Sequence, residues 1–305
     1  MKALICNEFG STKNLTLEEV KSPEPGAGQV LIDVHAAGIN FPDVLTVQGK
    51  YQFKPSLPFT PGIEVSGVIK KVGKDVKMRK VGDEVISTLQ TGAFASEVVT
   101  SENSTFLKGN MSFEQAAGFA LTYGTSYYAL KQRARLVAGE TVLVLGAAGG
   151  VGVATIQLAK AMGANVIAAA SNDTKLDFAE EAGADLRINY TNENLKERVK
   201  ELTNGQGADV IYDPVGGDFS EQAFRAIAWN GRFLVIGFAS GPIAKMPLNL
   251  ALLKGASLVG VFWGSWSARE PNESQNNFSE LIKMVDDKKF IPLVLSLIHI
   301  SEPTR

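Results

Sequence analysis

Cysteine and histidine are almost missing from this chain of 305 residues, which holds one Cys and two His. A single cysteine, Cys6, cannot build an internal disulfide framework or a Cys-rich zinc lobe. Two histidines leave little room for imidazole-based metal or acid–base chemistry. A reducing, cytoplasmic compartment is therefore expected.

Long apolar runs and an excess of one charge are lacking as well. No run approaches the roughly 20 apolar residues that cross a bilayer, and the four apolar residues near the N-terminus are too few for a secretion signal. The 30 Lys+Arg against 32 Asp+Glu give a net charge of -2, so nothing electrostatic favours nucleic acid or an anionic membrane as a partner. With 45% hydrophobic residues, the length predicts about two folded domains.

Short apolar segments, separated by Pro and Gly, fill the first half up to about Thr122. They are typical of short, mostly antiparallel strands curled into a barrel-like domain. The expected strands are residues 2–6, 15–20, 29–37, 65–72 and 96–99.

Strand and helix patterns alternate between residues 141 and 237, which predicts a doubly wound parallel sheet. Asn172 or Asp173 is expected to cap one of these helices and Gly183 to end it. The expected strands are 141–145, 165–170, 208–212 and 232–236, and the expected helices are 151–162, 174–182, 192–202 and 219–228.

A glycine-rich turn joins the strand 141–145 to the helix that follows. Against the pattern G-x-G-x-x-G, Ala147 stands at the first Gly, Gly149 at the second and Gly152 at the third. Such a turn lets the backbone approach a pyrophosphate at a helix N-terminus. The candidate cofactor-binding residues here are Ala148, Gly149, Gly150 and Val151. The alternative is a glycine-rich turn that serves packing alone.

The end of the next strand bears on the choice of nicotinamide cofactor. NAD sites usually carry an acidic residue there, whereas this strand ends in Ala170 and Ser171, with Lys175 in the first turn of the next helix. A hydroxyl and an ammonium suit a 2′-phosphate, so NADPH is predicted. Asp173 argues against this choice, and Lys175 as a solvated surface lysine is the alternative.

The whole pattern resembles the medium-chain dehydrogenase/reductase superfamily, and within it the zinc-independent NADPH:quinone oxidoreductase group. The resemblance implies an α/β chain with a GroES-like β-barrel catalytic domain at 1–122, completed by 265–294, and a Rossmann NADPH-binding domain at 123–264. The segments that carry it are 38–43 (GINFPD), 61–67 (PGIEVSG), 81–85 (VGDEV), 147–152 (AAGGVG) and 213–217 (DPVGG).

The resemblance also implies a reaction without metal. Zinc-dependent relatives carry Cys at the position of Asn40 and His at that of Ile63, and Ile63 offers no ligand. Hydride transfer to a quinone or an α,β-unsaturated carbonyl is therefore expected, with Asn40 and Tyr51 as the catalytic residues that polarise the substrate. The alternatives are a turn residue for Asn40 and an aromatic wall for Tyr51. Asp43 and Glu64 are expected to make structural hydrogen bonds.

Further cofactor contacts follow from the resemblance alone. Thr125 matches a threonine beside the nicotinamide, Tyr190 a contact near the 2′-phosphate, and Phe238 a residue by the nicotinamide ribose. Phe262 and Trp263 lie in a segment whose backbone meets the carboxamide. As bare sequence, Phe238, Phe262 and Trp263 are more typical of core or interface aromatics than of site residues, and only the resemblance favours a place in the site.

Two other readings of the function stay open: an enoyl-thioester (enoyl-CoA type) reductase and a non-catalytic, crystallin-like NADPH-binding protein. A homodimer through the edge near residues 258–263 is expected from the family. The tail at 295–305 (LSLIHISEPTR) breaks the preceding pattern and matches a translated sequencing adapter, so we expect it to be non-native; a natural terminal strand is the alternative.

Overall fold

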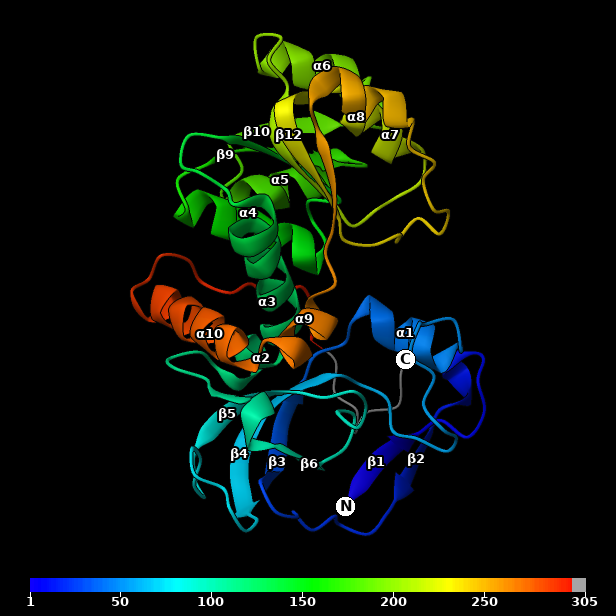
Figure 1. Ribbon diagram of the computed structural model, residues 1–305. Helices are drawn as coiled ribbons and strands as arrows, with labels where there is room; N and C mark the ends of the chain where they lie inside the picture. The colour runs from blue at the N-terminus through cyan, green and yellow to red at the C-terminus, as the bar shows by residue number, and fades with distance from the viewer. Residues whose placement is uncertain (298–305) are drawn as a thin grey trace. The chain divides into compact units, whose positions relative to one another are not determined.

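The computed structural model describes residues 1–297 and divides them into two compact units (Figure 1). The first comprises Met1–Leu121, Val285–Asp287 and residues 291–297, and the second comprises Thr122–Met284 and Lys288–Phe290. Most of helix α10 (Pro271–Asp286), in the segment expected to complete the barrel, groups with the second unit. Residues 298–305 of the expected non-native tail lie outside the described residues.

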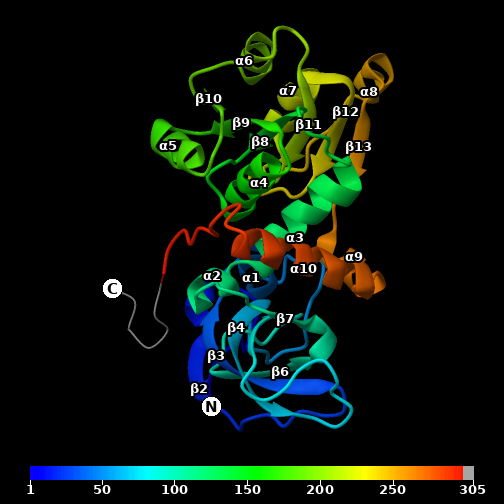
Figure 2. The ribbon, with the colours of Figure 1, turned by 90° about the vertical axis from the view of Figure 1, so that its left-hand side faces the viewer.

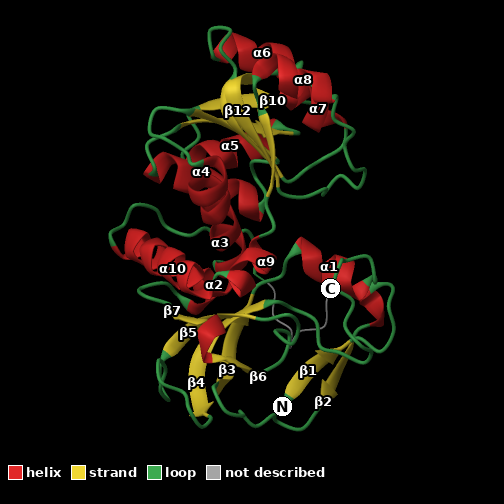
Figure 3. Cartoon of the chain, viewed as in Figure 1, coloured by secondary structure: helices red, strands yellow, loops and turns green. Residues whose placement is uncertain are grey.

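The first unit is built on antiparallel strands, as predicted (Figure 3). A five-stranded sheet has the order β6-β3-β4-β5-β7, and β1 pairs with β2 in a separate ribbon. The strands are β1 (Lys2–Ile5), β2 (Thr16–Glu19), β3 (Gln29–Ala37), β4 (Glu64–Val72), β5 (Glu84–Thr88), β6 (Glu97–Ser101) and β7 (Thr105–Leu107). Helices α1 (Phe41–Val47) and α2 (Phe113–Ala117) and the 3-10 turns η1 (Thr12–Asn14) and η2 (Glu102–Ser104) join them.

Alternating apolar residues of these strands make the core of the first unit. Val30 and Ile32 of β3 face Val65 and Ile69 of β4, all nearly inaccessible to solvent. The strands approach closely at Gly67, where a Cβ would lie 2.0 Å from the carbonyl oxygen of Asp33. This close pairing requires glycine and fixes the start of β4 relative to the segment that follows β3.

The second unit is a six-stranded parallel sheet with the order β10-β9-β8-β11-β12-β13, which confirms the doubly wound fold. Helices α4 and α5 pack against β8, β9 and β10, and α6, α7 and α8 cover the opposite face (Figure 2). The strands are β8 (Thr141–Leu145), β9 (Asn165–Ala170), β10 (Leu186–Asn189), β11 (Ala208–Asp213), β12 (Ile227–Val235) and β13 (Ser257–Gly260). The helices are α3 (Ala120–Tyr128), η3 (Ala129–Ala134), α4 (Gly150–Ala161), α5 (Asp173–Glu181), α6 (Leu195–Leu202), α7 (Asp218–Arg225), α8 (Leu248–Lys254) and α9 (Trp263–Arg269).

Three boundaries in the second unit differ from the expected ones by more than one residue. Helix α6 starts later than residue 192 because Asn194 caps it, its side chain accepting from the Glu197 amide. Helix α7 ends at Arg225 because the chain turns directly into β12, which begins at Ile227 and not at residue 232. The short strand β10 was not predicted. No helix within residues 1–297 is long and apolar enough to span a membrane.

Candidate active site

The glycine-rich turn has the geometry that the sequence predicts. Gly146 follows β8 with φ at +60°, and Gly149 is the N-cap of α4. A Cβ on Gly152 would lie 2.4 Å from the carbonyl oxygen of Gly146, so this helix can start so close to the strand only with glycine there. The residues Ala148, Gly149, Gly150 and Val151 form the turn and the first residues of α4.

This turn is suited to a phosphate. The first N–H groups of a helix have no partner within it, and the helix dipole adds positive potential. Gly149 is exposed, and bare backbone without a side chain allows a ligand to come close. The turn therefore fits the pyrophosphate of a dinucleotide, although the same glycines also serve the packing described above.

A cluster at the carboxyl ends of β9 and β10 joins three predicted residues. The Lys175 Nζ donates to the Ser171 Oγ at 2.9 Å. Burial raises the pKa of Tyr190, and its hydrogen bond with Ser171 partly offsets that rise. These three residues, Ser171, Lys175 and Tyr190, are called the phosphate cluster below. They meet because β10 pairs in parallel with β9, which brings their carboxyl ends to one edge.

Asp173, the residue that argued against NADPH, has a partner of its own. Asn189 Nδ2 donates to Asp173 Oδ1 at 3.1 Å, and Asn189 is only 7% exposed. The N-cap of α5 is Asn172, whose Oδ1 accepts from the Lys175 amide at 3.0 Å. Sequence reasoning did not identify Asn189, because no motif contains it; its place at the end of a strand beside β9 is the only signal that could have revealed it.

The residues expected near the nicotinamide lie on separate elements of the second unit. Thr125 is partly buried on α3, beside Ser126, whose Oγ lies 3.0 Å from the Tyr212 hydroxyl. Phe238 and Phe262 are exposed. Trp263 is 7% exposed, and its side chain packs edge-to-face on Phe278.

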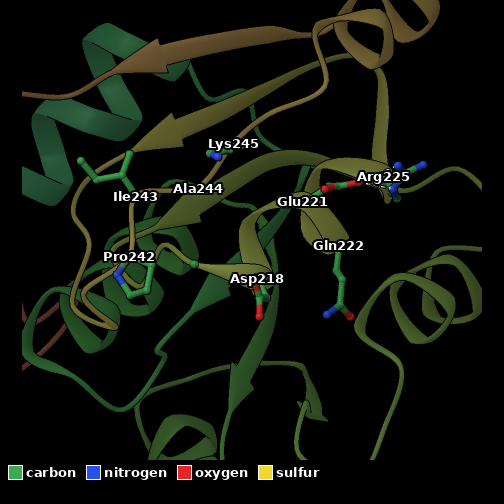
Figure 4. A pocket seen from close by; sticks show the side chains of 9 residues that line it. Asp218, Glu221, Gln222, Arg225, Pro242, Ile243, Ala244 and Lys245 are labelled. Atoms are coloured by element: carbon green, nitrogen blue, oxygen red, sulfur yellow. Dashed lines mark hydrogen bonds and ion pairs between the residues drawn. The ribbon is translucent and has the colours of Figure 1, made fainter.

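A surface pocket of about 360 Å³ lies between the start of α7 and the segment that follows Phe238 (Figure 4). Its charged lining includes Asp218, Glu221, Arg225 and Lys245. Arg225 Nε donates to Glu221 Oε1 at 3.0 Å, so these two charges largely satisfy each other. None of the expected cofactor residues lines this pocket.

In the first unit, Asn40 contacts a buried carboxyl group. Asn40 precedes α1, and its Nδ2 donates to Glu64 Oε1 at 2.7 Å. Glu64 Oε2 accepts from the Leu121 amide at 2.8 Å. Burial raises the pKa of Glu64 to about 7, although these hydrogen bonds work in the opposite direction. Glu64 opens β4, so the pairing of β3 with β4 brings it to Asn40.

Asp43 and Tyr51 belong to the same group, which is called the amide cluster below (Asn40, Asp43, Tyr51 and Glu64). Asp43 Oδ2 accepts from the Asn40 amide at 2.8 Å, while its buried Oδ1 has no hydrogen-bond partner within residues 1–297. Burial raises the pKa of Asp43 to about 7. Burial, and then the charge of Asp43, raise the pKa of Tyr51. Asp43 and Glu64 accept hydrogen bonds, as predicted.

Two side chains in and beside this cluster are not of the types that usually bind zinc, and the carboxylates of Asp43 and Glu64 are the remaining candidates. Asn40 offers a neutral amide, and the neighbouring Ile63 has a hydrocarbon side chain. Zinc sites in proteins use thiolate, imidazole or carboxylate ligands. Among the described residues, no group of three or more His, Cys, Asp or Glu side chains is placed to hold a metal ion.

Two family comparisons match most of the chain. Residues 26–143 match the alcohol dehydrogenase GroES-like domain, and residues 150–287 match the zinc-binding dehydrogenase family. The chain therefore combines the two parts of a medium-chain dehydrogenase/reductase.

Similarity to individual proteins assigns the chain to one family within this superfamily. The chain is 46% identical to a quinone oxidoreductase-like protein 2 homolog of Nematostella vectensis, over 88% of this chain and 74% of the relative. The quinone oxidoreductase structure from Pseudomonas syringae has a TM-score of 0.88 at 33% identity, covering 94% of this chain and 89% of that one. The Escherichia coli quinone oxidoreductase, solved with NADPH, has a TM-score of 0.86 at 30% identity, covering 95% and 89%. The chain belongs to the quinone oxidoreductase family of oxidoreductase enzymes within the medium-chain dehydrogenase/reductase superfamily.

Proposed function

We propose that this protein transfers hydride from NADPH to a quinone or an α,β-unsaturated carbonyl, without a metal ion. Residues 123–264 bind the cofactor in this proposal, and residues 1–122 polarise the substrate. The observation that carries the proposal is the phosphate cluster, where a lysine and a hydroxyl meet at the end of β9.

The residues of the second unit fit NADPH. The glycine turn suits the pyrophosphate, and Lys175 and Ser171 suit the 2′-phosphate, with Tyr190 beside them. Asp173 would repel that phosphate, but its hydrogen bond with Asn189 gives its carboxylate a protein partner. When bound, NADPH supplies the hydride. Thr125, Phe238, Phe262 and Trp263 are proposed as contacts on the nicotinamide side.

The amide cluster supplies the substrate chemistry in this proposal. A quinone or enone that accepts hydride develops negative charge on oxygen, and hydrogen-bond donors stabilise that charge without a Lewis acid. Asn40 has a second amide N–H beyond the one given to Glu64, and Tyr51 has a phenolic O–H. We propose that these two groups orient and polarise the substrate oxygen.

The acceptor profile tests this proposal. The purified protein is assayed for NADPH oxidation with 1,4-benzoquinone, 9,10-phenanthrenequinone, 2-alkenals and crotonyl-CoA. Turnover with quinones or alkenals is the expected result. A strong preference for crotonyl-CoA would replace the proposal with an enoyl-thioester reductase. Intact NADPH binding without any turnover would replace it with a non-catalytic role.

We also propose that two copies associate through the edge strand β13. This strand ends the six-stranded sheet, and nearby α8 exposes Leu252 to 81% and Leu253 to 68%. Analytical ultracentrifugation should give the molar mass of two chains for the unaltered protein. The Leu252→Lys substitution should lower the measured molar mass toward that of a single chain. The matched control is Leu186→Lys on β10 at the other edge of the sheet, which should leave the mass unchanged. A single-chain mass for the unaltered protein would contradict the proposal.

A further inference from the structure

We propose that Glu64 is a positioning residue, which holds the side-chain amide of Asn40 in the one orientation that presents an N–H to the substrate oxygen. The inference rests on the role proposed for Asn40, and it assigns a purpose to a carboxyl group that the reaction itself does not use.

The placement of Glu64 is tightly determined. Glu64 is 1% exposed. Its Oε1 lies 2.7 Å from Asn40 Nδ2, and its Oε2 lies 2.8 Å from the backbone nitrogen of Leu121. Gly38 leaves room for it, because a Cβ on that glycine would lie 2.3 Å from Glu64 Oε1. A carboxyl group held in this way cannot turn to follow Asn40, so Asn40 has to adapt to it.

The hydrogen-bonding capacity of a carboxylate determines which end of the Asn40 side-chain amide faces Glu64. An Asn side chain can present either its oxygen or its NH₂ to a neighbour, but an ionised carboxylate only accepts. Both groups that contact the Glu64 oxygens at these distances are N–H donors, which is the pattern of an ionised acceptor. Asn40 therefore turns its nitrogen toward Glu64, and its second N–H has a defined direction.

The role of Glu64 should depend on pH, because only the ionised carboxylate is restricted to accepting hydrogen bonds. Burial raises the pKa of Glu64 to about 7, so the carboxylate and the Asn40 bond should become stronger as the pH rises through neutrality. The charged group that acts on Glu64 from helix α1 is Asp43, which raises the same pKa. The backbone amides of Ala120 and Leu121 favour the ionised form.

A double-mutant cycle tests the proposal. Glu64→Gln cannot satisfy both donors, because one end of its amide is itself a donor. Measured with NADPH and the best quinone, Glu64→Gln should lower kcat about tenfold, a part of the roughly 10²-fold that a lost oxyanion donor costs. In the Asn40→Ala background the same substitution should change kcat less than about twofold, since the residue it acts through is gone. Equal factors in both backgrounds, or no effect in either, would overturn the proposal.

A matched variant separates positioning from simple destabilisation. Glu102 is also buried and accepts two backbone N–H groups, from Lys77 and Met78. Both N–H groups bind Oε2, so Glu102→Gln can keep them and Glu102→Ala is the control that removes the acceptor. Glu102→Ala should lower the melting temperature at least as much as Glu64→Gln does and leave kcat unchanged. NADPH affinity, followed by cofactor fluorescence, should stay the same in all variants. A kcat loss in Glu102→Ala equal to that in Glu64→Gln would mean that only stability had been measured.

A measurement on the unaltered protein keeps the test independent of folding. The NMR signals of the Asn40 side-chain NH₂, assigned by their loss in Asn40→Asp, should show one strongly downfield proton that moves with pH near 7. Two ordinary, pH-insensitive signals would overturn the proposal whatever the kinetics show. If the unaltered protein turns over no quinone or enone, the proposed function fails and the inference with it; if turnover is normal and the cycle shows no coupling, only the inference fails.

Discussion

The phosphate cluster and the amide cluster both contain side-chain hydrogen bonds, but their charged groups differ in exposure to solvent. In the phosphate cluster, Lys175 is exposed, and within residues 1–297 it contacts a hydroxyl and not a carboxylate, so its charge stays available to an anion. In the amide cluster, Asp43 and Glu64 are buried, and three of their four carboxylate oxygens accept hydrogen bonds within the protein. An exposed lysine is therefore suited to bind a charged ligand, whereas a buried carboxylate is suited to hold a neighbouring neutral donor in one orientation.

Removal of the Lys175 charge from the phosphate cluster should have the largest effect on activity. Lys175→Ala should lower kcat/KM for NADPH by roughly 10- to 100-fold, the range for a hydrogen bond to a charged group. The value for NADH, which has no 2′-phosphate, should change less than about twofold. Steady-state kinetics with both cofactors measure the ratio.

The control for this prediction is Lys196→Ala, which removes an exposed lysine from α6. It should leave the NADPH to NADH ratio unchanged. An equal loss of both cofactors in Lys175→Ala would remove the basis for the choice of NADPH.

The burial of the amide cluster should appear in the pH dependence of stability. The folded-state pKa of Asp43, about 7, lies above its ordinary value of 3.8, so its contribution to stability is present below pH 4 and is lost as the pH rises through 7. Asp43→Asn removes this loss. Its unfolding free energy should equal that of the unaltered protein near pH 4 and exceed it by on the order of 2 kcal/mol at pH 8.

Urea unfolding at the two pH values measures this difference. Glu64 titrates in both proteins and therefore largely cancels from the comparison. A stability difference that does not depend on pH would show that Asp43 is not held in a protonated, buried form.

The smallest expected effect concerns Asp173, which is hydrogen-bonded to Asn189 beside the phosphate cluster. Asn189→Ala releases the Asp173 carboxylate, which should lower NADPH affinity by about threefold to fivefold, as expected for one partly screened like charge. Asp173→Asn in the same background should restore the affinity, because the repulsion is gone. Titration of cofactor fluorescence measures both. A loss that Asp173→Asn does not repair would indicate a distorted strand end instead of a released charge.

Local sequence signals predicted the elements with strong apolar patterns. Strands β3, β8 and β9 have the predicted bounds, because each is an apolar or alternating run between turn residues. Strand β10 has no such signal, since Leu186 and Arg187 are exposed and the strand has four residues. The bounds of α7 and β12 depended on a turn at Ala226 that the pattern of residues 219–228 does not show.

The two clusters were predictable to different degrees. Ser171 and Lys175 are four residues apart on one strand-to-helix connection, so their meeting follows from local structure. Asn40 and Glu64 are separated by 24 residues and meet only through the pairing of β3 with β4. The sequence therefore indicated the residue types, but the contact that orients Asn40 needed the tertiary fold.

The central claim is that protein donors, and not a bound cation, stabilise the charge that develops on the substrate. The most direct test is to measure NADPH-linked reduction of 9,10-phenanthrenequinone together with the metal content of the same preparation, before and after treatment with a chelator. Full turnover with only traces of zinc, and no loss of activity on chelation, is the expected result. Stoichiometric zinc, with activity that disappears on chelation and returns with added zinc, would contradict it.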